Sequence, residues 1–384
     1  MTHEYEAAFA AWLGAERAFA FWKGRVALYA ILRALRVGAG DEVVVPGYTC
    51  VMDVNPVYYV GAKPIYVDIE PATFNIDPTR LAASITPRTK VILAQHTYGY
   101  PCALDDILAI AGRHGVAVVE DCCLAVGSRY RGRLVGNFGV ASYFSSQWNK
   151  PYTTGIGGIA ATSDANVARG IDAVVGEGCS APRGREVAML AAQLAAYRTL
   201  IYPVTTALAT AMFRRLTRLG LVVGSSRADE FSTDMAADFF KGMGDVQARS
   251  GLRQLHGIQR NLAHRRRMAR LYDDLLAELG WPARHVPDNV DPVLVRYPVR
   301  VANKQRAVSA AAGRLVELGD WFQCPLHPKD TPLEAYGYQN GMCPVAERAC
   351  AEVVNLPLHP RAGERTARRT VALLASVGPA PSAA

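Results

Sequence analysis

Short apolar runs alternate with amphipathic segments along the first half of the chain. The runs Val43–Val45, Val91–Gln95 and Val116–Glu120 contain few polar interruptions, which is typical of strands that are buried on both faces of a parallel sheet. Between the last two runs, Leu104–His114 repeats its apolar positions with helical spacing. Repeated strand–helix–strand units predict an α/β fold whose parallel strands are connected by right-handed crossovers.

The same reasoning extends the predicted elements to both ends of the chain. Further helices are expected at Tyr5–Ala20, Val26–Leu35, Leu81–Ile85, Leu252–Leu279, Lys304–Leu318 and Arg365–Val377. Further strands are expected at Pro64–Val67, Ala141–Phe144 and Val293–Val301. With 384 residues and 50% hydrophobic content, the chain can bury a core in two lobes. We expect a large domain over residues 1–238 and a smaller C-terminal α/β lobe over residues 239–384.

A lysine follows one of these strands at its turn into a glycine-rich loop. Lys150 comes after Ala141–Phe144 and before Gly155–Gly158. A lysine held there can be partly desolvated, and desolvation makes an amine nucleophilic, as a Schiff base to an aldehyde cofactor requires. The alternative is a surface lysine in a polar turn.

A carboxylate follows another predicted strand. Val116–Glu120 leads directly into Asp121, at the edge where open α/β sheets bind ligands. Pyridoxal phosphate needs a lysine for its aldehyde, a carboxylate for its pyridine nitrogen and donors for its phosphate. Lys150 and Asp121 would supply the first two, and Ser145 could supply part of the third. Asp121 could instead cap a helix N-terminus.

Ordered motifs along the chain resemble those of the DegT/DnrJ/EryC1/StrS sugar aminotransferases, a family of fold-type I pyridoxal phosphate enzymes. They are Gly24–Leu28, Gly40–Pro46, Gly61–Pro64, Phe74–Asp77, Ile85–Lys90, His96–Gly99, Glu120–Asp121, Ser145–Pro151 and Leu356–Pro360. The resemblance runs from Ala7 to Leu373 and is broken mainly between residues 175 and 238. It implies a large domain with a mostly parallel central sheet, a smaller C-terminal α/β lobe and a homodimer with its sites at the interface.

The resemblance also implies which residues surround the cofactor. The expected cofactor-binding residues are Lys150, Asp121, Gly24, Arg25, Val26, Ser145, Cys50, Tyr48 and Cys123. In the family, the turn at Gly24 cradles the phosphate at a helix N-terminus, although an ordinary helix start is the alternative. Relatives often carry a hydroxyl residue where this chain has Arg25, and an aromatic residue where it has Cys50. Either Cys50 packs against the cofactor ring or Tyr48 replaces the aromatic residue.

Four residues are candidates for substrate contact: His96, Tyr98, His327 and Lys241. His96 follows a predicted strand, where a hydrogen-bonded structural histidine is the alternative. Relatives carry an asparagine near residues 239–242, and in them it reaches the cofactor phosphate of the neighbouring subunit. Lys241 could take over a phosphate or substrate contact there.

The reaction implied by the resemblance is amino-group transfer to a keto-sugar, usually nucleotide-linked, from an amino acid donor, commonly L-glutamate. Lys150 would move the proton as general base and acid, and Asp121 would keep the pyridine ring an electron sink. Such enzymes serve amino-sugar, polysaccharide or secondary-metabolite biosynthesis. Two alternatives stay open: another pyridoxal phosphate reaction on a sugar or lipid-linked substrate, such as dehydration or C–N bond formation, and a non-catalytic regulatory protein on the same fold.

Charge and cysteine content narrow the partners and the compartment. The net charge of +8 suits an anionic substrate or an anionic membrane surface, and no basic stretch is interleaved with aromatic residues as nucleic-acid binding would require. The eight cysteines lack the paired spacing of a metal site, so we expect no metal. The start of the chain lacks the pattern of a signal peptide, which predicts a cytoplasmic protein with reduced thiols.

Residues 188–223 combine apolar helical patterns with arginines. This combination is typical of a helical hairpin at a membrane surface or over a site, and no apolar run in it is long enough to span a membrane. A peripheral membrane contact, with a lipid-linked substrate, is therefore one prediction. A helical insertion packed on the partner of a homodimer is the other.

Overall fold

Seven strands form the central sheet of the computed structural model, which describes residues 1–148, 150–200 and 231–380. In sheet order they are β1 (Arg17–Phe21), β10 (Gly158–Thr162), β9 (Ala141–Ser145), β6 (Ala117–Asp121), β5 (Thr89–Gln95), β2 (Glu42–Pro46) and β4 (Lys63–Val67). The five strands from β9 to β4 are parallel, whereas β10 runs antiparallel to both of its neighbours. The predicted mostly parallel α/β sheet is confirmed.

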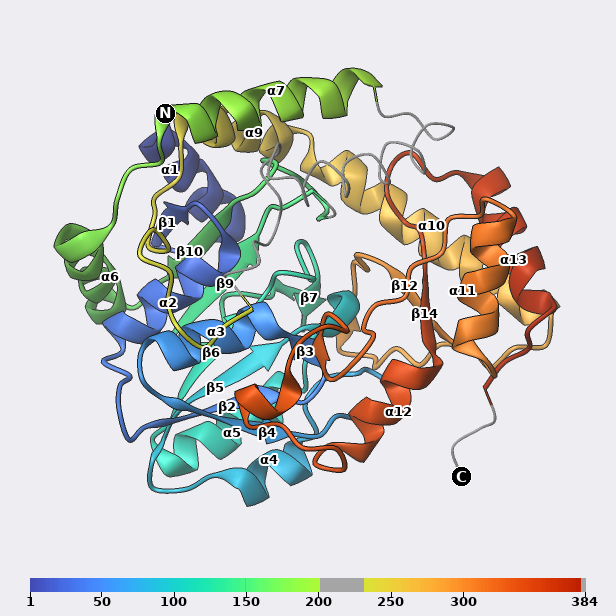
Figure 1. Cartoon of the computed structure of the whole chain (residues 1–384), viewed down its shortest axis with the longest axis horizontal. Helices are drawn as coiled ribbons and strands as arrows, with labels where there is room; N and C mark the ends of the chain where they lie inside the picture. The colour runs from blue at the N-terminus through green and yellow to red at the C-terminus, as the bar shows by residue number, and fades with distance from the viewer. Residues whose placement is uncertain (149, 201–230, 381–384) are drawn as a thin grey trace.

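Alternate residues of each strand feed two separate hydrophobic cores, one on each face of the sheet. Val43 and Val45 lie in one core, and Val44 lies in the other. The first core is covered by α2 (Gly24–Ala34), α3 (Val51–Tyr59) and α6 (Ala165–Gly178), and the second by α1 (Thr2–Leu13), α4 (Pro78–Ser84), α5 (Leu104–His114) and α9 (Asp245–His256). Helices therefore enclose both faces, which is why the strands read as continuous apolar runs (Figure 1).

A second lobe lies at the side of the sheet (Figure 1). It contains α10 (Ile258–Glu278), β12 (Tyr297–Arg300), α11 (Lys304–Gly313), α12 (Pro344–Glu352), β14 (Val353–Leu356) and α13 (Glu364–Ala375). β12 and β14 pair antiparallel, and α13 packs against both α10 and α11. The smaller elements are β3 (Thr49–Cys50), η1 (Thr97–Gly99), β7 (Arg129–Tyr130), β8 (Arg133–Leu134), β11 (Val290–Asp291), β13 (Leu326–His327) and η3 (Leu333–Tyr336).

Three of the predicted helices were wrong in extent, and the one expected at Lys304–Leu318 ends at Gly313. The helix expected at Tyr5–Ala20 ends at Leu13, because Gly14 takes the left-handed conformation at φ 84°, and the following residues form β1. The helix expected at Leu252–Leu279 is two helices, α9 and α10, which meet at Gly257. Glycine is a poor helix former, and here it marks the change of direction.

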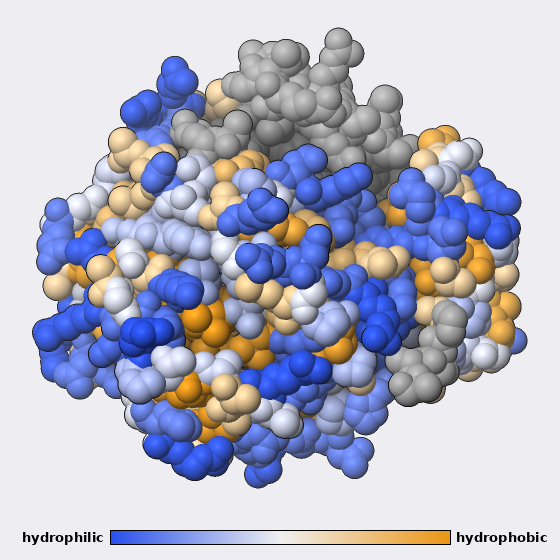
Figure 2. All heavy atoms as spheres, turned by 60° about the horizontal axis from the view of Figure 1, so that its bottom comes forward, coloured by the Kyte–Doolittle hydropathy of each residue, from blue (hydrophilic) through white to orange (hydrophobic). Residues whose placement is uncertain are grey.

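Part of the segment at 188–223 falls on α7 (Gly184–Leu200), which packs against α9. Its remainder, 201–223, lies outside the described residues, so the predicted membrane contact stays a prediction. In the part of the chain that the structure describes, no helix is both long and apolar enough to cross a membrane. Figure 2 shows a face on which hydrophilic side chains predominate, with smaller hydrophobic areas between them.

Candidate active site

The predicted lysine and aspartate lie at the carboxyl ends of two neighbouring parallel strands. β6 ends at Asp121, and β9 ends at Ser145, five residues before Lys150. Behind the lysine the loop is tied down, because the Thr154 N–H donates to the Ser146 carbonyl at 2.9 Å. The carboxyl edge of a parallel sheet is where open α/β folds bind ligands, so both residues stand in the expected place.

Asp121 is a buried acid with a fixed orientation. Its side chain is 3% exposed, and Oδ1 accepts a hydrogen bond of 2.8 Å from the Cys123 N–H. The residues after it form turns and no helix, so Asp121 does not cap a helix. A buried carboxylate of this kind suits the protonated pyridine nitrogen of pyridoxal phosphate, which would need an anionic partner there.

Lys150 is half-buried rather than free on the surface. Its Nζ lies 5.6 Å from the ring centroid of Trp321, and its charge acts on Asp53, Cys50 and Cys123. The amine is therefore directed toward the same space as these three side chains. This placement favours the reactive lysine over the alternative of a lysine in a surface turn.

Glycines let a helix N-terminus approach the two strands of the site. A Cβ on Gly24, the first residue of α2, would lie 3.1 Å from the Cβ of Ser145. A Cβ on Gly158 would lie 2.3 Å from the Lys23 carbonyl oxygen. The Val26 N–H donates to that same carbonyl at 3.1 Å, so the Gly24 and Arg25 amides are the better donors for an anion. A helix N-terminus beside a serine fits the phosphate of the cofactor.

Arg25 brings a buried cation where relatives often carry a hydroxyl residue. Its side chain is 6% exposed, and Nη1 contacts Met52 Sδ on α3. Its charge also acts on the Cys50 thiol. The guanidinium therefore lies between α2 and α3, close to the residues that face Lys150.

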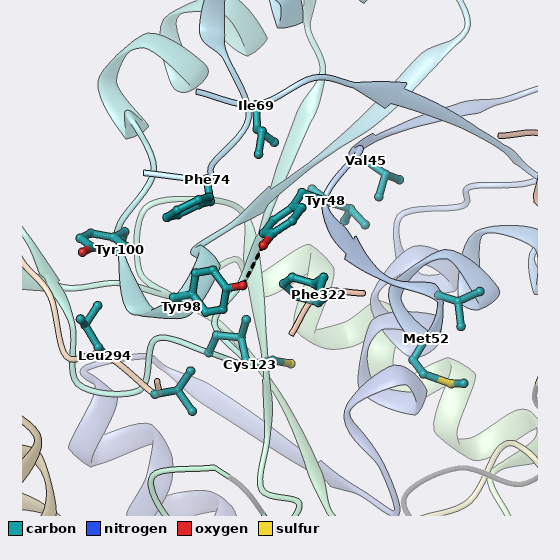
Figure 3. Close-up of a cluster of buried hydrophobic side chains, with 14 of the residues drawn as sticks. Val45, Tyr48, Met52, Ile69, Phe74, Tyr98, Tyr100, Cys123, Leu294 and Phe322 are labelled. Atoms are coloured by element: carbon teal, nitrogen blue, oxygen red, sulfur yellow. Dashed lines mark hydrogen bonds between the residues drawn. The ribbon is translucent and has the colours of Figure 1, made fainter. Parts of the chain in front are cut away.

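Tyr48 belongs to a buried aromatic cluster. It is fully buried, its hydroxyl is 2.8 Å from that of Tyr98, and its ring centroid lies 4.7 Å from that of Phe322. Figure 3 shows the two tyrosine hydroxyls pointing toward each other among apolar side chains. Of the two residues proposed for the cofactor ring, the structure favours Cys50, which lies within electrostatic reach of Lys150. Burial raises the pKa of Cys50 to about 12, so its thiol would pack as a neutral group.

Tyr98 supports the wall of the site instead of facing it. Its hydroxyl donates to the Trp321 carbonyl at 2.5 Å, and the ring is fully buried. The Trp321 ring lies near Lys150, so Tyr98 holds the backbone of a residue that borders the amine.

His96 and Lys241 are engaged elsewhere in the protein. His96 Nε2 lies 3.1 Å from Glu120 Oε2, and Nδ1 accepts from the Cys102 N–H at 3.0 Å, so the structural alternative describes this histidine. Lys241 Nζ donates to Glu186 at 2.9 Å, and the lysine is 4% exposed. Neither side chain is brought to Lys150 within this subunit.

His327 reaches the site from the small lobe. β13 pairs in parallel with β3, and this pairing places His327 beside Cys50. Its ring centroid is 5.9 Å from that of Trp321. Burial lowers the pKa of His327 to about 4, so its ring is neutral at physiological pH. Its Nδ1 accepts from the Gln323 N–H at 3.4 Å, which leaves the Nε2–H as the group that could donate to a substrate.

A family model with the description DegT/DnrJ/EryC1/StrS aminotransferase family matches residues 1–375. The chain belongs to this family. Membership makes it a pyridoxal phosphate-dependent aminotransferase of fold type I. The resemblance found in the motifs and the expected enzyme class are confirmed.

Named relatives within the DegT/DnrJ/EryC1/StrS family include two enzymes of sugar metabolism. The chain is 32% identical over 380 residues to a GDP-perosamine synthase of Caulobacter vibrioides, which covers 97% of this chain and 89% of the relative. It is 29% identical over 358 residues to a UDP-2-acetamido-2-deoxy-3-oxo-D-glucuronate aminotransferase of Pseudomonas aeruginosa, covering 93% and 85%. An aminotransferase structure from Psychrobacter cryohalolentis matches with a TM-score of 0.76 at 26% identity, covering 98% of this chain and 90% of the other.

Sequence reasoning missed two residues of this aminotransferase site, Asp53 and Trp321. Asp53 lies in the first turn of α3, and Tyr143 Oη donates to its Oδ1 at 3.1 Å. The available signal was a single acidic residue three positions after Cys50 in an otherwise mostly apolar segment. Trp321 gave no local signal, because its contact with Lys150 joins residues far apart in the chain.

Proposed function

We propose that this aminotransferase moves an amino group from L-glutamate to a keto-sugar carried on a nucleotide, in amino-sugar biosynthesis. The observation that carries the proposal is that Asp121 ends β6 while the loop of Lys150 follows the neighbouring parallel strand β9, with the glycine cradle at the start of α2 beside it. The nucleotide-linked class is supported by the two named relatives, whose names give GDP- and UDP-linked sugars. The net charge of +8 favours the approach of such an anionic substrate.

Each residue of the site has a separate task in this proposal. When bound, pyridoxal phosphate supplies an electron sink that lets a proton leave the carbon next to nitrogen. Lys150 Nζ would take that proton as general base and return it as general acid. Asp121 would hold the proton on the pyridine nitrogen, and the Gly24 and Arg25 amides with Ser145 would anchor the phosphate.

The surroundings of Lys150 suit proton transfer because they are largely apolar and close to neutral. Trp321 borders the amine, and the neighbouring Cys50 thiol and His327 ring are uncharged near pH 7. Such walls limit the access of water to the reacting carbon.

The proposal includes a homodimer, as the family implies. A cytoplasmic enzyme acting on a diffusible nucleotide sugar needs no membrane contact. A lipid-linked substrate would instead call for the peripheral membrane contact that is predicted for the arginine-bearing segment at 188–223.

The test is the absorbance spectrum of the protein purified with pyridoxal phosphate, before and after L-glutamate. We expect a visible band in wild type that collapses to a near-ultraviolet band with glutamate, and neither change in Lys150→Ala. Lys90→Ala is the matched control, because Lys90 is an exposed lysine on β5. Return of the visible band on adding a GDP- or UDP-linked keto-sugar would identify the acceptor.

A stable visible band that ignores glutamate and other amino acids would contradict transamination by this protein. The chemistry would then be another pyridoxal phosphate reaction on the same site. Absence of the visible band in wild type would favour the alternative of a non-catalytic protein.

A further inference from the structure

A stripe of polar side chains runs along α9 and α10 and faces the loop that carries Lys150, residues 150–156, here called the lysine loop. The stripe consists of Gln247, Ser250, Gln254, Asn261 and Arg265. The first three lie three and four residues apart, which places them on one face of α9. Gln247 is fully buried, and Ser250 and Arg265 are each 2% exposed. Buried helix positions usually hold apolar side chains, so a polar stripe there needs a reason.

The part of the stripe on α9 binds the backbone of the lysine loop. Gln254 binds both polar groups of the Thr153 backbone, because its Nε2 donates to the Thr153 carbonyl and its Oε1 accepts from the Thr153 N–H at 3.1 Å. The Ser250 hydroxyl donates to the same carbonyl at 3.1 Å. Gln247 Nε2 donates to the Ile156 carbonyl at 2.6 Å. These side chains satisfy backbone groups of a buried loop, as the partner strand does in a sheet.

Asn261 on α10 holds the carbonyl next to the lysine, and the orientation of its amide is fixed. Its Nδ2 donates to the carbonyl of Pro151, the residue directly after Lys150. Arg265 Nε donates to Asn261 Oδ1 at 2.9 Å. An arginine has donors only, so the Asn261 atom that faces Arg265 must be the oxygen. The nitrogen of the amide is therefore turned toward the lysine loop.

Arg265 connects this end of the stripe to the opposite wall of the site. Its Nη1 donates to the Val295 carbonyl at 2.8 Å, and the Val295 N–H donates to the Tyr98 carbonyl at 2.9 Å. The Tyr98 hydroxyl in turn holds the carbonyl of Trp321, whose ring borders the Lys150 amine. One hydrogen-bonded network thus fixes both the backbone next to the lysine and the wall beside its amine.

We propose that the stripe aims Lys150 at the reacting carbon, with Asn261 as the positioning residue nearest to the lysine. The inference rests on the proposed function, because it takes Lys150 as the group that moves the proton. A lysine amine ends a long flexible stem, so the backbone that carries it must be fixed if the amine is to reach one point. Asn261 fixes that backbone at Pro151, and Arg265 keeps the Asn261 amide turned toward it.

The first test is Asn261→Asp, which keeps the shape of the side chain but replaces the donor to the Pro151 carbonyl by an acceptor. The new carboxylate faces Arg265 and can pair with it, so the Tm should equal or exceed that of wild type. The carboxylate also repels the Pro151 carbonyl and displaces the loop. We therefore expect kcat with L-glutamate to fall by about 10-fold or more while KM stays within about twofold. A wild-type kcat would overturn the inference.

Asn137→Asp is the matched control for this variant. Asn137 also donates through Nδ2 to backbone carbonyls, those of Leu13 at 2.9 Å and Leu134 at 3.2 Å, and both lie outside the lysine loop. The control loses the same kind of hydrogen bond and should keep the wild-type kcat. An equal fall of kcat in both variants would show a general effect of the new charge and would overturn the role of Asn261.

Hydrogen exchange of the apoprotein reads the loop without any reaction. The Thr153 N–H donates to Gln254, and the Thr154 N–H donates to the Ser146 carbonyl at 2.9 Å. Both amides should exchange about 10-fold faster or more in Asn261→Asp, whereas those of α5 should exchange as in wild type. Unchanged exchange in the lysine loop would overturn the inference, even if kcat fell.

Gln254→Glu keeps the inference testable if Asn261→Asp does not fold. It retains the acceptor for the Thr153 N–H and loses the donor to the Thr153 carbonyl. It should also lower kcat, keep KM and speed exchange in the lysine loop, and wild-type values of kcat and exchange would overturn the role of the stripe. Failure of the proposed function is distinct from these outcomes. A wild-type protein that ignores glutamate would overturn that function, and hydrogen exchange would still show whether the stripe holds the loop.

Discussion

Asp121 owes its expected role to its burial and its negative charge. An amide cannot keep a pyridine nitrogen protonated as a carboxylate does. The Asp121→Asn variant should therefore still bind the cofactor but catalyse the reaction more slowly. We expect the reaction with L-glutamate to slow by about 100-fold or more, within the range that acid–base groups contribute. Stopped-flow decay of the visible band measures this rate.

The control for that experiment is Asp106→Asn, which alters an exposed carboxylate on α5. It should react like wild type. If Asp121→Asn also reacted at the wild-type rate with full cofactor content, Asp121 would not be the partner of the pyridine nitrogen.

His327 should make the folded protein sensitive to acid. Its pKa is lowered to about 4 in the folded state by burial, whereas an unfolded histidine has a pKa of about 6.5. Between these values the unfolded state binds the proton and the folded state does not, so stability falls as pH drops from about 6.5 to about 4. This single group contributes about 2–3 kcal/mol of that loss.

His327→Gln should remove this part of the acid sensitivity. Thermal unfolding at several pH values should show a smaller fall in Tm for the variant than for wild type. His3→Gln, which changes an exposed histidine of α1, should follow wild type. Parallel curves for His327→Gln and wild type would show that the ring is not held neutral by burial.

Asp121 could be singled out at the residue scale because it stands at the end of an apolar strand, and Lys150 because it lies in the loop five residues after another strand. Asp53 could not, since its importance comes from Tyr143, a partner 90 residues away in sequence. His96 shows the reverse error. Its place after a strand resembles that of a site residue, yet its side chain turns to Glu120, on the other face of β6 from Asp121.

At the scale of elements, the phosphate cradle depends on how closely α2 approaches β10. A methyl group on Gly158 would meet the Lys23 carbonyl oxygen at 2.3 Å, and backbone atoms cannot turn aside as a side chain can. Gly158→Ala should therefore push the start of α2 away and weaken pyridoxal phosphate binding by about 10-fold or more. Fluorescence titration of the apoprotein with the cofactor measures the affinity.

Gly112→Ala offers a matched control on α5, where a new methyl group would meet nothing within 4 Å. Alanine is the better helix former, so this variant should keep the affinity and gain about 0.5–1 kcal/mol of stability. Equal cofactor affinity in Gly158→Ala and Gly112→Ala would mean that the cradle is not the phosphate site.

Elements that owe their form to distant partners were the hardest to predict. The stretch after Gly14 continues a helical pattern in the sequence, but it becomes β1 because it completes the sheet beside β10, with Phe19 opposite Ala160. Tertiary pairing overrides local preference there. The five parallel strands from β9 to β4 could be predicted without knowledge of their partners, because burial on both faces leaves a continuous apolar signal in each of them.

At the scale of the whole molecule, the site is assembled from both lobes. Trp321 and His327 come from the second half of the chain and border Lys150 and Cys50 from the first. A single sequence contains no direct record of such contacts. The two-lobe arrangement could be expected from the resemblance, but the residues that close the site from the small lobe needed the structure.

Lys241 ties together three segments that are far apart in sequence. Its amine donates to Glu186 and Asp238, its backbone carbonyl accepts from the Trp22 N–H at 2.9 Å, and it forms a bridge with Ser180. Because the amine already has two carboxylate partners within its own chain, we expect it to stabilise the fold and not to bind the cofactor phosphate of a partner subunit. Lys241→Met should therefore lower the Tm by several degrees, equivalent to about 1–2 kcal/mol.

Cofactor affinity in Lys241→Met should stay within about twofold of wild type, well below the tenfold change that 1.4 kcal/mol represents. Light scattering on the same samples should give a homodimer, about twice the 41.5 kDa of one chain, for both proteins. A large loss of affinity with an unchanged Tm would place the Lys241 amine on the phosphate across the dimer interface, in the role that the asparagine has in relatives. Because Glu186 would lose its lysine partner in the variant, Glu186→Gln combined with Lys241→Met should recover part of the lost Tm if the ion pair is the cause.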